Sequence, residues 1–167
     1  VFHIPIYNAI IGNANTDFKR RTIVDGTDMR LTDFTDFGLR ALMRLAGDPE
    51  RVFTTDELAR ELKISRHHLT KIVGGLARGG FVSTQRGAGG GFRLARPAQS
   101  ITIGAVVRAL EDRQTLVECF RTDGGCCSLT PKCRLKSKLK AAEDAFLREL
   151  DKTALSECAV PSRRAAA

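Results

Sequence analysis

The sequence has few histidines, and none of them lies close to a cysteine. The histidines are His3, His67 and His68, whereas four of the five cysteines fall between positions 119 and 133. A cysteine nucleophile needs a base beside it, and no pair of carboxylates stands out from ordinary helix-surface charge. The sequence therefore predicts that the protein is not an enzyme.

Long hydrophobic runs and a secretion signal are also missing. Residues 1–28 contain a short apolar run, but no basic residues precede it and it is too short to cross a bilayer. We expect no membrane association and a cytoplasmic location, where clustered cysteines bind metal or sense redox more often than they form disulfides. Because Met29 begins the first well-patterned segment, we expect residues 1–28 to be a disordered extension or an artefact of an upstream start.

Acidic residues are too few to balance the basic ones. Lys and Arg number 27 against 19 Asp and Glu, a formal charge of +8. Residues 1–28 hold three charges of each sign, so the whole surplus belongs to the rest of the chain. A basic surplus of this size is typical of proteins that bind phosphate-bearing partners, although a generic basic protein is the alternative.

Two short helices joined by a tight turn follow a first predicted helix that runs from Leu31 to Gly47. The first of the pair begins at Thr54, which has capping-box spacing with Glu57, and the second follows the N-cap residue Ser65 and stops at Gly79. This pattern favours a helix-turn-helix, although a helical hairpin whose polar face only meets solvent is the alternative. The residues that we expect to contact DNA from the second helix are Ser65, Arg66, His67, His68, Thr70 and Lys71.

A glycine-rich hairpin comes next and favours the DNA-binding interpretation. Residues 81–83 and 92–94 are typical of strands, and residues 86–91 form a flexible tip. The glycines fail the spacing of a dinucleotide motif, and no phosphate loop follows. The sequence therefore predicts a winged helix in which Arg86, Gly87 and Arg93 approach the DNA backbone or minor groove.

The C-terminal third predicts a further helix after Pro97 and a long last helix, with Thr130 as N-cap and Pro131 at its first position. Its apolar residues alternate spacings of three and four, which favours a partner helix from a second subunit: Leu135, Leu139, Ala142, Phe146 and Leu150.

The predicted fold is mainly α, with a winged helix-turn-helix domain over residues 29–98. A cluster loop and dimerisation helix over residues 99–160 and a tail over residues 161–167 follow. A homodimer suits a palindromic double-stranded operator.

Cysteines gather between the last two helices. Cys119, Cys127 and Cys133, with Cys126 as an alternative to Cys127, supply thiolates for a soft metal or an iron-sulfur cluster. Structural zinc competes, but adjacent Cys126 and Cys127 do not have the spacing of a usual zinc knuckle. With Pro131 opening the last helix, Cys133 would be its third residue, near the positive helix end, while Gly124 and Gly125 let the loop curve. We expect Cys158 to be a free thiol.

Several motifs together resemble a known family: residues 31–42 (LTDFTDFGLRAL), 86–94 (RGAGGGFRL), Cys119-Phe120 and 130–135 (TPKCRL). They resemble the NsrR group of nitric-oxide-sensing repressors, among the winged-helix iron-sulfur regulators that include IscR and RirA. The resemblance covers residues 29 to about 160. Residues 1–28 have no counterpart in it.

The resemblance implies a homodimeric repressor with one 4Fe-4S cluster per subunit, or a 2Fe-2S cluster instead, held by Cys119, Cys127 and Cys133. It also implies that Asp36 of the partner subunit is the fourth ligand, although a carboxylate in a first helical turn is favourable without any metal. Nitric oxide would then dismantle the cluster and release DNA, derepressing genes for nitrosative stress. The alternatives are an iron or cluster-supply sensor of the same fold and a zinc or thiol-redox regulator.

Overall fold

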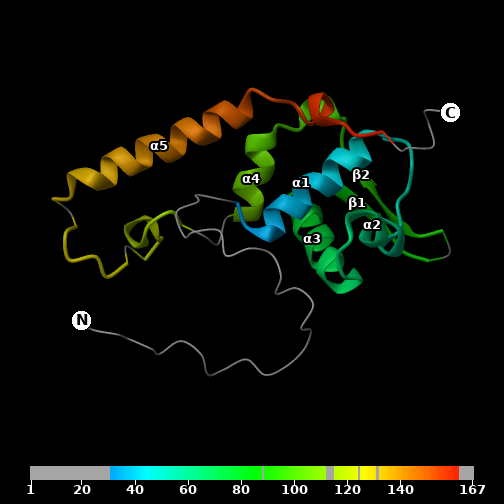
Figure 1. Ribbon diagram of the computed structural model, residues 1–167, viewed down its shortest axis with the longest axis horizontal. Helices are drawn as coiled ribbons and strands as arrows, with labels where there is room; N and C mark the ends of the chain where they lie inside the picture. Colours follow the sequence, from blue (N-terminus) through cyan, green and yellow to red (C-terminus); the bar gives the residue numbers. More distant parts are fainter. Residues whose placement is uncertain (1–30, 88, 112–114, 124, 131, 162–167) are drawn as a thin grey trace, which may run out of the picture. The chain divides into compact units, whose positions relative to one another are not determined.

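The computed structural model describes residues 31–161, except residues 88, 112–114, 124 and 131. The expectation for residues 1–28 therefore lies outside the described residues, as does nearly all of the predicted tail. The elements in chain order are α1 (Asp33–Ala46), α2 (Thr55–Leu62), α3 (Arg66–Arg78), β1 (Val82–Gln85), β2 (Gly91–Leu94), η1 (Ala98–Ser100), α4 (Ile103–Glu111), η2 (Glu118–Phe120), α5 (Arg134–Asp151) and η3 (Leu155–Cys158) (Figure 1). Of the helices in this part of the chain, none is both long and apolar enough to span a membrane.

Hydroxyl side chains begin each of the first three helices, and the sequence predicts this for α2 and α3. The Thr32 hydroxyl accepts a hydrogen bond from the Thr35 backbone at 3.2 Å, and Thr54 and Ser65 cap α2 and α3 in the same way. Only half of the predicted capping box forms, because the Glu57 carboxylate pairs with Arg51. These caps satisfy backbone N–H groups that a helix leaves unpaired at its start, and so they set where each helix begins.

A two-stranded antiparallel hairpin follows α3 and confirms the predicted wing. Val82 pairs with Leu94 and Gln85 with Gly91, which leaves residues 86–90 as the tip. Gly87 has φ of 100°, a backbone conformation that favours glycine. Phe53, which precedes α2, exchanges two backbone hydrogen bonds of 2.9 Å with Phe92, and this bridge ties the wing to the helix-turn-helix.

One hydrophobic core joins the segments on both sides of the boundary that we expected between residues 98 and 99. It includes Leu42, Leu69 and Leu76 from the N-terminal helices, and also Val106 from α4 and Leu155 from η3. Each of these side chains is essentially inaccessible to solvent. The helices α1 to α3 and the C-terminal helices therefore share their packing.

The start of α5 differs from the prediction. The helix begins at Arg134, and Cys133 occupies its N-cap position with extended backbone angles, φ −74° and ψ 109°. Because an extended residue interrupts the helix, the prediction that Thr130 caps α5 and that Cys133 is its third residue is wrong. The Thr130 backbone instead donates to the Cys127 carbonyl in a local turn, and Pro131 lies outside the described residues.

Phe53 offers a test of this core. Its ring is fully buried, and the guanidinium groups of Arg44 and Arg51 lie 4.9 and 4.8 Å from its centroid. We expect Phe53→Ala to lower the free energy of unfolding by about 3–5 kcal/mol, because it leaves a cavity at the junction of wing and helices. The control Leu129→Ala, at a loop residue that is 67% exposed, should change it by less than about 0.5 kcal/mol. Urea unfolding measures both, and equal losses would contradict this description of the core.

Candidate functional site

The N-terminal end of α3 presents polar side chains to solvent. Ser65, Arg66, His67, Thr70 and Lys71 are all exposed. Two of their hydroxyls already serve the helix itself, since Ser65 accepts from the His68 backbone at 3.1 Å and Thr70 donates to the Arg66 carbonyl at 2.9 Å. Arg66 pairs with Asp56 at 3.2 Å across an exposed surface, a weak contact that a phosphate can replace. Arg66, His67 and Lys71 are therefore the longer side chains that this end of the helix offers to a partner.

His68 has a different environment from its neighbours. It is half-buried, and its ring meets the Phe37 ring edge-on, with centroids 5.7 Å apart and planes at 73°. The contact belongs to the packing of α3 against α1. A DNA contact by His68 stays a prediction, and it would have to use the part of the ring that Phe37 leaves free.

The wing carries the two predicted arginines at different places. Arg86 lies at the exposed hairpin tip beside Gly87. Arg93 lies in β2, opposite Ser83, and is also exposed. Both guanidinium groups are therefore accessible to solvent, as a contact with DNA phosphates requires.

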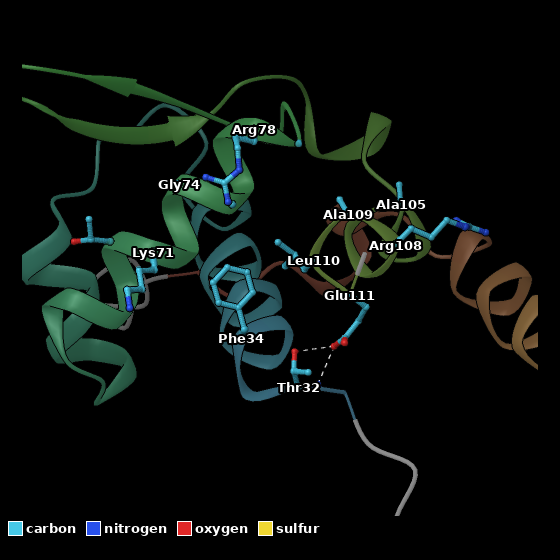
Figure 2. A pocket seen from close by; sticks show the side chains of 13 residues that line it. Thr32, Phe34, Lys71, Gly74, Arg78, Ala105, Arg108, Ala109, Leu110 and Glu111 are labelled. Carbon is cyan, nitrogen blue, oxygen red and sulfur yellow. Dashed lines mark hydrogen bonds between the residues drawn. The ribbon is translucent and has the colours of Figure 1, made fainter. Parts of the chain in front are cut away.

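An open groove of about 1130 Å³, which the sequence does not reveal, runs along α3. Figure 2 shows α1, α3 and α4 around it, with the Thr32 hydroxyl and backbone both donating to a Glu111 carboxylate oxygen at 2.8 Å. Glycines and alanines line much of its wall: Gly74, Gly75, Gly79, Ala105 and Ala109. In the sequence, the glycines within the predicted helix were the only indication that other helices approach α3 closely around this groove.

The cysteine loop lies between α4 and α5 and folds back on itself. Cys119 belongs to η2, Cys127 lies in the irregular loop, and Cys133 caps α5; all three are half-buried free thiols, whereas Cys126 is exposed. The Cys126 backbone donates to the Glu118 carboxylate at 3.0 Å. Gly125, at φ 59°, lies so close to the Glu118 backbone that a side chain there would collide with it. Gly124 lies outside the described residues.

The thiols have the right chemistry for an iron-sulfur cluster but do not form a closed ligand set in one chain. No three His, Cys, Asp or Glu side chains of the described ranges lie close enough together to hold a metal ion. Asp36 forms a two-point ion pair with Arg40, at 3.0 and 2.8 Å, on the exposed side of α1. Three half-buried sulfur donors fit the soft ligand set that iron-sulfur clusters prefer, so the donor types match even though their arrangement is open.

The long helix α5 leaves apolar side chains uncovered. Leu135 is 61% and Phe146 is 40% exposed, and none of its residues is fully buried. Leu147 and Leu150, near its C-terminal end, pack against the core. The predicted apolar seam is therefore divided, with one end packed within the chain and the rest exposed to solvent.

Known proteins resemble this chain over the same region. Residues 31–160 match the Rrf2 family, described as an iron-dependent transcriptional regulator. The HTH-type transcriptional regulator NsrR of Geobacillus kaustophilus (strain HTA426) is 45% identical over 130 residues, which are 77% of this chain and 88% of that protein. This relative confirms the resemblance that the sequence motifs indicate.

Solved structures agree with the fold. The structure of CymR (YrzC), titled the global cysteine regulator of B. subtilis, is 28% identical, with a TM-score of 0.63 over 79% of this chain and 97% of that chain. The IscR structure from T. potens is 24% identical, with a TM-score of 0.58 over 77% of this chain and 84% of that one, and shows the fold alone. The predicted mainly helical winged helix-turn-helix fold is thus confirmed, and the chain belongs to the Rrf2 family of transcriptional regulators.

Proposed function

We propose that this protein is a homodimeric repressor whose affinity for operator DNA depends on an iron-sulfur cluster that reacts with nitric oxide. The single observation that carries the proposal is the presence, in one chain, of an exposed reading helix with an arginine-bearing wing and of three half-buried free thiols in the loop that leads into α5. The 45% identity to NsrR supports the choice of signal.

Binding to double-stranded DNA would use α3 and the wing together. The start of α3 brings Arg66, His67 and Lys71 to the major groove, where base edges can be read. The wing brings Arg86 and Arg93 to neighbouring phosphates or the minor groove. The Phe53–Phe92 bridge ties the wing to the segment that precedes α2, and so it holds the wing against the helix-turn-helix.

Cys119, Cys127 and Cys133 would hold the cluster, of the 4Fe-4S type or else of the 2Fe-2S type, with Asp36 of the partner subunit as the fourth ligand. When bound, the cluster supplies iron that nitric oxide can attack, most readily where an oxygen ligand stands in place of a thiolate. Arg40 orients the Asp36 carboxylate through its two-point pair, and Glu118 holds the backbone at Cys126. The first contact orients a proposed donor and the second shapes the loop beside Cys127, within each chain and before the two subunits meet.

The two subunits would associate through α5. Its exposed apolar residues include Leu135 and Phe146, on a helix otherwise rich in charge. A second copy of α5 would cover them, and two reading helices related by a two-fold axis suit a palindromic operator. Loss of the ligands shared between subunits would shift the dimer away from the DNA-binding arrangement and lower its operator affinity.

Single cysteine-to-serine substitutions, compared with two control variants, test which thiols bind the cluster. In anaerobically reconstituted protein, we expect Cys119→Ser, Cys127→Ser and Cys133→Ser to lose most bound iron and sulfide and to lose operator affinity. Cys126→Ser and Cys158→Ser, the matched controls, should keep both. Iron and sulfide counts with an electrophoretic mobility assay measure the result. Loss in Cys126→Ser but not in Cys127→Ser would reassign the middle ligand, and unchanged operator binding in all variants would overturn the proposal.

The response to nitric oxide is tested on the same reconstituted protein. We expect stoichiometric nitric oxide to bleach the visible absorption and release the operator, because the signal acts on the bound iron. A release caused by a mild iron chelator at lower concentration than by nitric oxide would favour the iron-supply sensor instead. Zinc in place of iron in anaerobically purified protein would favour the zinc or thiol-redox regulator.

Wing arginines and reading-helix residues should respond differently to substitution. Arg86→Ala should weaken binding to all sequences alike and reduce the salt slope by about one, because it removes a phosphate contact. Arg66→Ala or His67→Ala should also relax sequence preference, by about 1–3 kcal/mol if a base contact is lost. Titrations of operator and scrambled DNA at several salt concentrations measure both. No effect from any of them would place the reading surface elsewhere.

Introducing charged side chains on α5 tests the proposed interface between two copies of this helix. Phe146→Glu combined with Leu135→Glu should shift the protein toward monomer, because carboxylates would be buried against a like helix. Leu116→Glu, at an apolar loop residue that is 43% exposed, is the matched control and should leave the dimer intact. Sedimentation equilibrium measures the association. A dimer that survives the double substitution would contradict a role for α5.

A further inference from the structure

The C-terminal end of α5 is fastened to α4 by an ion pair with two hydrogen bonds. Arg108 donates to Asp151 from both terminal nitrogens, at 2.7 and 2.6 Å. The hydrogen bonds from Arg108 hold the pKa of the Asp151 carboxyl below its ordinary value, so the pair stays charged at neutral pH and is lost only as pH falls through that lowered pKa. A planar guanidinium on a carboxylate also sets the angle between the groups, which a single hydrogen bond does not.

Glycine at position 104 brings the two helices into direct backbone contact. A Cβ atom there would lie 2.2 Å from an Asp151 carboxylate oxygen and 2.9 Å from the Leu147 carbonyl oxygen. The chain beyond α5 adds two backbone hydrogen bonds: Ile103 donates to Thr153 at 3.0 Å, and Leu155 donates to Ile101 at 2.8 Å. The joint between α4 and α5 therefore has little freedom to bend.

The C-terminal end of α4 is in turn wedged between α1 and α3. A Cβ atom at Gly38 would lie 2.5 Å from one methyl group of Leu110, and one at Gly75 would lie 3.5 Å from the other. Figure 2 shows Leu110 beside Phe34, whose ring would meet the same Cβ of Gly75 at 2.9 Å. Ala109, the neighbour of Leu110, also contacts α3, since a Cβ atom at Gly79 would lie 3.5 Å from its methyl carbon.

The opposite end of α5 carries the cysteine loop. Cys133 is the N-cap of this 18-residue helix, which is about 27 Å long. The residues of α5 that pack against the core, Leu147 and Leu150, lie in its last turns. A displacement at Cys133 is therefore carried along a helix that its own chain holds mainly at the far end.

We propose that Arg108 and Asp151 are positioning residues that couple the cysteine loop to the DNA-reading helix. The path runs from Cys133 along α5 to the Arg108–Asp151 pair, and from α4 through Leu110 to Gly75 of α3. The inference rests on the proposed function, because that function supplies the signal at the cysteine loop. The contact between α4 and α5 can nevertheless be tested without any cluster.

The exposure of the pair makes it suitable for substitution. The Arg108 and Asp151 side chains are 44% and 36% exposed, and ion pairs in such positions contribute little to overall stability. Arg108→Gln should therefore fold, keep most of its side-chain packing and lose only the charge and the two-point geometry. Lys152→Gln, which removes an equally basic residue from an ion pair within the same chain segment, is the matched control.

Hydrogen exchange on the cluster-free dimer tests the joint. In Arg108→Gln, we expect amides of α4 and of residues 75–78 in α3 to exchange about threefold faster, as the loss of a modest ion pair allows. The Lys152→Gln variant should leave these amides unchanged. Faster exchange confined to residues 148–153 would show a merely local ion pair and overturn the proposal.

Operator affinity with and without bound iron tests the coupling. We expect the ratio of the two dissociation constants to fall at least about threefold in Arg108→Gln at unchanged iron content, and to keep its parental value in Lys152→Gln. The charge-swapped double variant, Arg108→Asp with Asp151→Arg, should recover part of the ratio. An unchanged ratio in Arg108→Gln would overturn the coupling role. If the unsubstituted protein binds operator equally well with and without iron, so that the ratio is one, the proposed function is refuted. The hydrogen-exchange experiment would still show whether the Arg108–Asp151 pair holds α4 and α5 together.

Discussion

The close approach of α4 to α1 and α3 is the constraint on which the rest of the structure depends. Leu110 fits between Gly38 and Gly75 because neither has a side chain, and Gly104 lets α5 approach α4 from the other side. Glycine within a helix costs stability relative to alanine, so these positions serve packing rather than helix formation. The three contacts join the DNA-reading helices and the C-terminal helices into one core, which also contains Leu155 from beyond α5.

Polar interactions then complete that core where apolar packing ends. Arg44 is almost fully buried, yet it pairs with Asp48 and Glu61 at 2.6 Å each and lies over the Phe53 ring. Burial alone would lower the pKa of Arg44, but the hydrogen bonds that Arg44 donates to the Asp48 and Glu61 carboxylates outweigh it and raise the pKa. A permanently charged group therefore links α1 and α2 to the Phe53 ring, whose backbone is bridged to Phe92 of the wing.

The cysteine loop obeys different rules from the core. Its contacts are mostly local, such as the Glu118 carboxylate with the Cys126 backbone and the Arg121–Asp123 ion pair. Such contacts keep the chain compact but do not draw Cys119, Cys127 and Cys133 into a closed group, and none of the described residues completes one. Metal ligation releases protons from thiols and contributes its own folding free energy, so in the proposed function the metal and the partner subunit together would complete the ligand set.

The sequence by itself determined the local structure: the capping hydroxyls of α2 and α3, the wing and its glycine tip, the apolar faces, and the thiol-rich loop. Each of these is encoded within a few neighbouring residues, because caps, turns and helical periodicity act over one or two turns of chain. It did not determine that His68 packs on Phe37 or that Arg108 meets Asp151. Those features join residues up to 43 positions apart, and they depend on how whole helices pack. Only the tertiary structure decided them, because a side chain's partner is set by the shape of the surfaces that burial brings together.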